Sequence, residues 1–262
     1  VYITQDMGTA DLKYQDHQIN KSVYVVGNEQ DYHFDVLFKI MRKLGRSYGP
    51  GLYHLSYGMV DLPTGKMKSR EGTVVDADEL MEEMVATAAH HTKELGKIEG
   101  FTETQATELY EMLGMGALKY FLLKVDPKKR MLFNPQESIE FQGNTGPFIQ
   151  YTHARIKSIL RKTGTAVTLT TNELLPLEKQ LAIELSLFPA IINEAADNLD
   201  PSKIAIYAFN LAKLFNTFYT EHSIANADTD TKKQLRIKIG ILTAATLQKA
   251  TGCLGIAVPE QM

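Results

Sequence analysis

The order of hydrophobic and polar positions divides the chain into a first part with strand and helix patterns and a second part with helix patterns alone. In the first part, the segment SVYVVG at 22–27 is rich in β-branched residues and ends in glycine, which predicts a strand. Apolar residues at helical spacing over 31–45 predict a helix, and alternation over 53–59 predicts a second strand. A strand, a helix and a strand in this order indicate part of a parallel α/β sheet.

The beginning of the chain also has a strand pattern. The segment VYITQDMGTA at 1–10 starts with strand-forming residues, and Gly8 is typical of a turn after them, so a further strand is predicted here. The first residue is Val1 rather than methionine, and neither a cap nor a turn precedes it. We therefore expect the sequence to be part of a longer protein whose N-terminal portion is missing.

From about residue 76 onward the pattern is helical almost to the end. Thr102 and Gln105 have the spacing of a capping box, and Pro189 is expected to break or kink the helix that contains it. The predicted helices cover about 77–96, 102–124, 147–163, 175–198, 201–222 and 230–251.

A segment rich in proline, glycine and asparagine, 126–147, is the expected hinge between an α/β part and an all-helical part of the chain. We predict an α/β domain over 1–140 and an all-helical domain over 141–262.

Composition narrows the class of protein. The 262 residues are 44% hydrophobic and 23% charged, which indicates a globular chain large enough for one large or two ordinary domains. The formal charge of -3 gives no global attraction to nucleic acid, so any site for a polyanion must be a local patch. No apolar run approaches the roughly 18 residues that span a membrane. The single cysteine, Cys253, excludes an internal disulfide and a multi-cysteine zinc site, and it favours a cytoplasmic location.

One loop concentrates positive charge. Lys66, Lys68 and Arg70 lie between Gly65 and Gly72, in a segment that follows the second predicted strand. Cations and flanking glycines can surround phosphate oxygens, and open α/β sheets bind their ligands at the ends of strands. A solvated basic turn is the alternative interpretation.

A second group of candidate residues follows the other predicted strands. Tyr2, Asp6 and Gln30 would lie near two strand ends, where a carboxylate could hold a cationic ligand such as a guanidinium. The alternatives are that Asp6 only stabilises a turn and that nearby His33 lies on a helix surface.

The third group lies in QYTHARIKSILRK at 150–162. Tyr151 and Arg155 are four residues apart and share one face of the predicted helix, and Lys157 and Arg161 share a neighbouring face. Interleaved aromatic and basic side chains suit a nucleic-acid backbone with an unstacked base on the ring. A solvated basic helix face would produce the same pattern.

Six segments occur in a fixed order: TQDMGTA, YVVGNEQDYHF, LSYGMV, KMKSREG, FQGNTGPFIQYTHARI and LGIAVPEQM. Together they resemble the C-terminal portion of the arginyl-tRNA synthetases, which are class I enzymes. The resemblance covers essentially the whole chain. It implies the C-terminal half of a Rossmann-type catalytic domain, followed by a helical-bundle anticodon-binding domain.

The resemblance implies an ATP site. Gly58, Met59 and Val60 match the segment along the adenine, and KMKSREG is similar to the class I KMSKS signature, with Lys66 and Met67 at its first two positions. This mobile loop stabilises the charge that develops as pyrophosphate leaves.

The second lysine of that signature is replaced by Ser69, so Lys68 or Arg70 is expected to act with Lys66 in catalysis. Mg²⁺ is expected only as the ion carried by ATP, without a dedicated protein site for a metal.

The arginine pocket of the family carries over to Tyr2, Asp6 and Gln30, with Asp6 pairing with the guanidinium. Residues that the family uses around the tRNA anticodon are matched by Tyr151, Arg155, Tyr219 and Met262. The family often has a tyrosine where Phe148 stands, so a hydroxyl contact there is not expected.

The resemblance therefore implies an arginine–tRNA ligase that activates L-arginine with ATP and transfers it to its tRNA in protein biosynthesis. The complete enzyme is expected to be a cytoplasmic monomer. The class I His-Ile-Gly-His signature does not occur in these residues, so we expect the isolated chain to be inactive. The alternative is a catalytically inactive module, derived from a synthetase, that binds tRNA or a protein.

Overall fold

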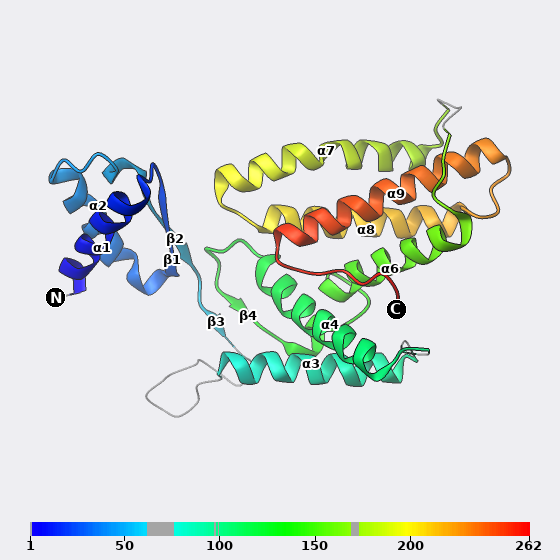
Figure 1. Ribbon diagram of the computed structural model, residues 1–262, viewed down its shortest axis with the longest axis horizontal. Coiled ribbons are helices and arrows are strands. Elements are labelled where there is room, and N and C mark those ends of the chain that lie inside the picture. Colours follow the sequence, from blue (N-terminus) through cyan, green and yellow to red (C-terminus); the bar gives the residue numbers. More distant parts are fainter. Residues whose placement is uncertain (1, 62–75, 97, 99, 169–172) are drawn as a thin grey trace. The chain divides into compact units, whose positions relative to one another are not determined.

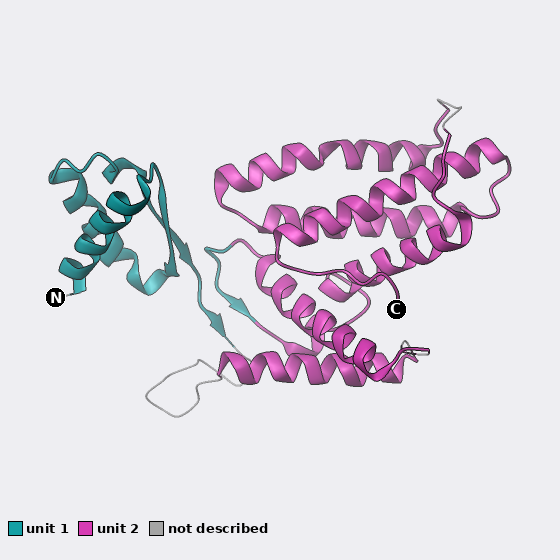
Figure 2. Ribbon diagram, in the orientation of Figure 1, with its two compact units in different colours: residues 1–61, 127–132 teal, residues 62–126, 133–262 magenta. Residues whose placement is uncertain are grey.

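The computed structural model describes residues 2–61, 76–96, 98, 100–168 and 173–262. The chain forms two compact units (Figure 2). Unit 1 consists of residues 1–61 and 127–132, and unit 2 consists of residues 62–126 and 133–262. Each unit is described separately below.

Unit 1 contains the α/β part of the chain (Figure 1). Its two longer strands pair in parallel, from Ser22 opposite Leu52 to Gly27 opposite Tyr57, with a helix between them in the sequence. This confirms the predicted parallel arrangement. The elements are α1 (Tyr2–His17), β1 (Ser22–Gly27), η1 (Asn28–Gln30), α2 (Asp31–Lys43), η2 (Gly49–Gly51), β2 (Leu52–Tyr57), β3 (Val60–Asp61) and β4 (Met131–Leu132).

The prediction of a strand at the start of the chain is wrong, because these residues form helix α1. Ala10 is buried in the core of unit 1, and Ile3, Met7 and Tyr14 pack against the same core at helical spacing. Gly8 lies within α1, and a Cβ added to it would meet no atom within 4 Å. The 3.6-residue period of the buried side chains therefore outweighs the β-branched residues at the beginning.

Unit 2 is helical, with bounds that confirm the six predicted helices to within a few residues (Figure 1). The capping box at Thr102 is present, since its hydroxyl accepts from the Gln105 amide and the Gln105 side chain accepts from the Thr102 amide. Pro189 does not break its helix, which continues through it. The helices are α3 (Ala77–Glu94), α4 (Glu103–Leu123), α5 (Pro135–Ser138), α6 (Gly146–Thr163), α7 (Pro176–Asn198), α8 (Ser202–Glu221) and α9 (Asp230–Cys253).

Helices α6 to α9 enclose the main hydrophobic core, in which Phe215, Phe218 and Leu247 are fully buried. Two glycines let α4 approach α6 closely. A Cβ on Gly116 would lie 2.4 Å from the Gln150 side chain, and a Cβ on Gly146 would lie 2.4 Å from the Gly116 carbonyl oxygen. This contact brings the Gln150 side chain against the backbone of α4.

A buried carboxylate joins α7 to α9. Glu178 is fully buried, and it accepts hydrogen bonds from Lys232 Nζ at 2.8 Å and Arg236 Nε at 3.0 Å. The backbone amide of Leu175 donates to it as well, at 2.9 Å. Burial by itself raises the pKa of Glu178, but these hydrogen bonds outweigh burial and leave the pKa below its usual value. Glu178 is therefore charged at neutral pH and compensates two cations.

Replacing Glu178 by glutamine should destabilise unit 2 by about 3 kcal/mol, because removing one member of a buried ionic cluster leaves the cations uncompensated. Urea denaturation of the purified protein measures the change. Glu194→Gln is the matched control on the same helix. Its ion pair with Lys203 is exposed to solvent, so little change in stability is expected. Equal stability of the two variants would contradict a supporting role for the buried cluster.

Candidate functional site

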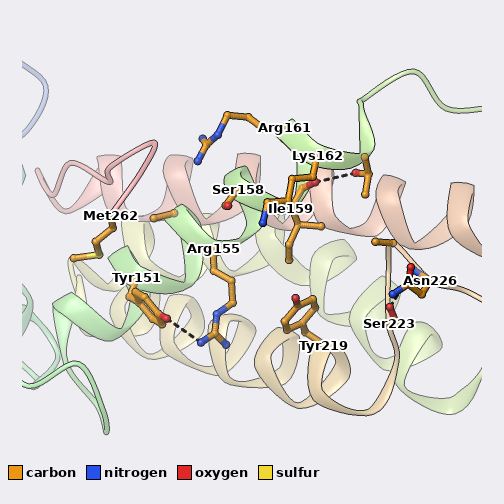
Figure 3. Close-up of a pocket in the computed structure, with 13 residues that line it drawn as sticks. Tyr151, Arg155, Ser158, Ile159, Arg161, Lys162, Tyr219, Ser223, Asn226 and Met262 are labelled. Atoms are coloured by element: carbon orange, nitrogen blue, oxygen red, sulfur yellow. Dashed lines mark hydrogen bonds between the residues drawn. The ribbon is translucent and has the colours of Figure 1, made fainter. Parts of the chain in front are cut away.

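A cavity of about 420 Å³ lies between α6 and α8 in unit 2 (Figure 3). Its wall combines aromatic, cationic and small polar side chains. One end is formed by Tyr151 and Met262, and the other end by Ser223 and Asn226. All four residues that were predicted to contact the anticodon line this one cavity: Tyr151, Arg155, Tyr219 and Met262.

The guanidinium of Arg155 occupies the middle of the cavity wall, between two tyrosine rings (Figure 3). Its Cζ lies 4.8 Å from the ring centroid of Tyr151 and 5.9 Å from that of Tyr219. Nη2 donates to the Tyr151 hydroxyl at 3.2 Å, and Nη1 donates to Asn216 Oδ1 at 2.9 Å. The contacts with the rings and the two hydrogen bonds hold the cation in one orientation.

Asn216 is a site residue that the sequence reasoning missed. Its Nδ2 donates to Thr152 Oγ1 at 2.7 Å and to the Ala212 carbonyl at 3.0 Å, so Oδ1 is turned toward Arg155. It lies three residues before Tyr219 on α8, and this helical spacing is the signal that could have identified it. Phe148, by contrast, packs against Phe209, with ring centroids 5.5 Å apart.

The segment that carries Met262 is held by side chains of α4 and α6. We call residues 255–260 the tail. Lys119 Nζ donates to the carbonyl of residue 255 at 2.7 Å, and Gln150 Nε2 to that of residue 257 at 2.8 Å. The His153 ring bonds to the carbonyl of residue 259 at 2.9 Å, and Arg161 Nη1 donates to that of residue 260 at 2.8 Å. The tail therefore follows a fixed path that ends at the cavity.

The other three cations of this part of α6 contact the tail or line the cavity. Lys157 forms an ion pair with the Glu260 carboxylate, at 3.0 Å. Arg161 and Lys162 both line the cavity, and Arg161 also bonds to the tail. The basic face predicted from sequence thus has a structural role in addition to any contact with RNA.

His153 is fully buried beneath the tail. Its Nδ1 must carry the proton, because the Pro259 carbonyl can only accept. Burial lowers the pKa of His153, and the nearby Lys157 acts in the same direction, whereas the bond to Pro259 and the charge of Glu260 oppose this change. Nε2 is buried and has no hydrogen-bond partner among the described residues. The neutral ring is therefore the form that fits here.

In unit 1, the structure places the predicted arginine-pocket residues on two helical segments. Asp6 lies within α1 rather than at the end of a strand, and Gln30 ends the short helix η1 directly after β1. Tyr2 is 82% exposed. Asp6 Oδ2 lies 2.7 Å from His33 Nε2, and the His33 side chain is only 25% exposed. His33 lies on α2, and Asp6 is its partner there.

The predicted adenine segment connects β2 to β3. The Gly58 amide donates to the Pro127 carbonyl at 2.7 Å, and the Met131 amide donates to the Met59 carbonyl at 3.1 Å. Val60 pairs with Met131 in the parallel β3–β4 ladder. A Cβ at position 58 would lie 2.4 Å from the backbone of residue 129, so glycine is required for this close approach.

The loop residues Lys66, Met67, Lys68 and Arg70 lie outside the described residues, so their predicted roles stay predictions. Within the described part of the chain, no group of three or more histidine, cysteine, aspartate or glutamate side chains could hold a metal ion. The helices that the structure describes include none with the length and apolar character to cross a membrane.

Comparison with known proteins identifies both parts of the chain. Residues 1–134 match the family described as tRNA synthetases class I (R), catalytic domain, and residues 149–262 match the DALR anticodon binding domain. The chain belongs to the arginyl-tRNA synthetase family. This confirms the resemblance and the predicted fold class. The predicted domain boundary at 140/141 falls between the two matched segments and stays a prediction.

Arginyl-tRNA synthetases from several organisms are similar to the whole chain. The arginine–tRNA ligases of Amoebophilus asiaticus and Flavobacterium psychrophilum are 58% and 53% identical to it, and in each case the match covers 100% of this chain. The match covers 45% and 44% of those proteins, so the chain spans less than half the length of these relatives.

Solved structures of the family have the same fold. The Thermus thermophilus arginyl-tRNA synthetase aligns with a TM-score of 0.84 and 28% identity over 93% of this chain and 41% of that one. The enzyme from Plasmodium falciparum aligns with a TM-score of 0.78 and 25% identity over 98% of this chain and 44% of that one.

The burial of neutral His153 predicts a pH dependence of stability. The pKa of His153 is lower in the folded protein than its ordinary value of 6.5. The contribution of His153 to stability is therefore complete above pH 6.5 and is lost as the pH falls below that value. Urea-unfolding midpoints at several pH values between 7.5 and 5.5 measure this loss. His153→Asn is the matched variant, since its amide can donate to Pro259 but does not titrate. Parallel pH profiles of the two proteins would contradict the prediction.

Proposed function

We propose that the protein containing this chain is an arginine–tRNA ligase, in which the chain supplies the arginine pocket, the KMSKS-like loop and the surface that recognises the anticodon. The complete protein would form arginyl-adenylate from L-arginine and ATP and transfer the arginyl group to tRNA. The cavity in which Arg155 is held between Tyr151 and Tyr219 is the observation that carries this proposal.

The cavity suits an unpaired nucleotide of an RNA loop. Bases in single-stranded RNA stack on aromatic rings and on the planar guanidinium of arginine, and this cavity presents both. Met262 supplies an apolar edge, and Arg161 and Lys162 supply positive charge for a phosphate. The asparagine and serine side chains at the other end can bond to base edges. Together, these features favour a site that recognises the anticodon over the alternative interpretation, a basic helix face that only contacts solvent.

The geometry at Asp6 supports binding of arginine. Its carboxylate is 42% exposed, and one oxygen bonds to His33, which would orient the group toward a ligand. A carboxylate pairs with a guanidinium through two parallel hydrogen bonds, which discriminates arginine from lysine. Gln30 and Tyr2 would complete the pocket, and His33 would act through Asp6.

The roles proposed for ATP binding rest on the signature match and on the backbone of the adenine segment. Gly58, Met59 and Val60 would lie along the adenine, while Lys66 with Met67 and the nearby cations Lys68 and Arg70 would stabilise the triphosphate and the leaving pyrophosphate.

Magnesium would arrive with ATP, whose phosphates supply most of its ligands. We further propose that the protein is a cytoplasmic monomer; the exposed, free thiol of Cys253 supports a reducing compartment.

Replacing Tyr219 by alanine should weaken binding of an arginine tRNA about tenfold, since loss of one stacked base costs about 1–3 kcal/mol. Tyr219→Phe keeps the ring and should bind like the unmodified protein. Affinities are measured at one fixed salt concentration, with the same tRNA bearing a substituted anticodon as the second ligand. If Tyr219→Ala weakened binding of both tRNAs equally, the residue would not read the anticodon.

Asp6→Asn in the complete protein should lower kcat/KM for arginine about 100-fold, since a hydrogen bond between charged partners contributes about 1.5–3 kcal/mol. The KM for ATP should stay unchanged. Arginine-dependent exchange of pyrophosphate into ATP measures both constants, and Asp16→Asn, an exposed change on the same helix, is the control. If Asp6→Asn left arginine activation unchanged, this pocket would not be the site that binds arginine. Absence of exchange in the unmodified complete protein would instead favour a non-catalytic binding module.

A further inference from the structure

Four hydrogen bonds hold the main chain of the tail, in addition to the ion pair of Glu260 with Lys157 and the packing of Ile256 in the core. Side chains of Lys119, Gln150, His153 and Arg161 bond to the carbonyl oxygens of residues 255, 257, 259 and 260. Every amino acid presents the same carbonyl, so these bonds determine the path of the tail and are independent of its sequence. A row of donors that follows an extended segment is the way in which proteins bind peptides through their backbone.

Two of these donors, Gln150 and His153, are fully buried. Gln150 Nε2 donates to the Met112 carbonyl at 2.9 Å as well as to the tail, so one amide joins α4, α6 and the tail. Gln150 Oε1 and His153 Nε2 have no hydrogen-bond partner among the described residues. A leucine in either place would avoid this desolvation cost. Packing of the helices alone therefore does not explain why polar side chains occupy these two positions.

The anchors lie close enough to Met262 to determine its position. His153 holds residue 259, and an extended chain covers at most about 3.6 Å per residue, so Met262 must stay within roughly 11 Å of that anchor. Met262 lies beside Tyr151 at one end of the cavity (Figure 3). Without the buried anchors, the polar contacts left to the tail among the described residues would be the exposed bonds of Lys119 and Arg161 and the ion pair of Lys157 with Glu260.

We propose that His153 and Gln150 are positioning residues for nucleotide recognition, which hold the tail so that Met262 forms a wall of the cavity. They touch neither the cavity nor its ligand and act through the tail backbone alone. The part of this inference that concerns RNA rests on the proposed function, whereas the position of Met262 can be measured without RNA.

The first measurement follows the methyl group of Met262 by NMR in protein labelled with ¹³C-methyl methionine, with Met262→Leu to assign the signal. His153→Ala should shift this signal to the position of a solvent-exposed methionine. His153→Asn should keep it in place, because its amide nitrogen can donate from the position of Nδ1. The signal of buried Met84, in the same unit, shows whether each variant is folded. Gln150→Leu is the second variant if His153→Ala does not fold.

The second measurement is a double-mutant cycle on the preference for the arginine anticodon, with His90→Asn as an exposed control. His153→Ala should reduce the preference by the same factor as Met262→Ala, and the double variant should lose no more than either single variant. Additive losses, or an unmoved Met262 signal in both His153→Ala and Gln150→Leu, would overturn the proposal. If the unmodified protein shows no anticodon preference, the proposed function fails, and the NMR result alone decides whether His153 positions Met262.

Discussion

The side-chain amide of Gln150 connects three parts of unit 2 that are far apart in the sequence. Its two hydrogen bonds reach the backbone of α4 and the backbone of the tail, and it can lie there only because position 116 has no Cβ. The cavity depends on this arrangement, since α6 supplies Tyr151 and Arg155, and Met262 follows directly after the tail. A change in the distance between α4 and α6 would therefore also alter the cavity wall.

The site combines exposed and buried polar groups with different roles. Asn216 orients Arg155 from α8, and the buried Gln150 and His153 orient the tail from α6. Buried polar groups contribute little net stability and are costly when incompletely paired, but they admit very few alternative arrangements. The buried ions around Glu178 lie between α7 and α9 instead, where they hold together the helices behind this surface.

Local signals explain what could be predicted from the sequence. Several helices of unit 2 have side-chain caps, such as Thr102 and Thr145, and Tyr151 and Arg155 share a face because they are four residues apart. Helix α1 was missed because β-branched residues at the start obscured the period of Ile3, Met7, Ala10 and Tyr14. The anchoring of the tail had no local signal, since each of its four bonds joins residues that are 99 or more positions apart. Backbone carbonyls, moreover, carry no sequence information.

Because the tail is bound through its carbonyl oxygens, its path does not depend on the identity of most of its side chains. The side chains that must be retained are those that pack inward, such as Ile256 and Pro259, together with Gly255 at a positive φ. Ala257 and Gln261 face solvent and are free to vary among related proteins. Position 262 can thus be exchanged as an independent unit, and natural selection or protein engineering can alter the chemistry at this end of the cavity without rebuilding the helices around it.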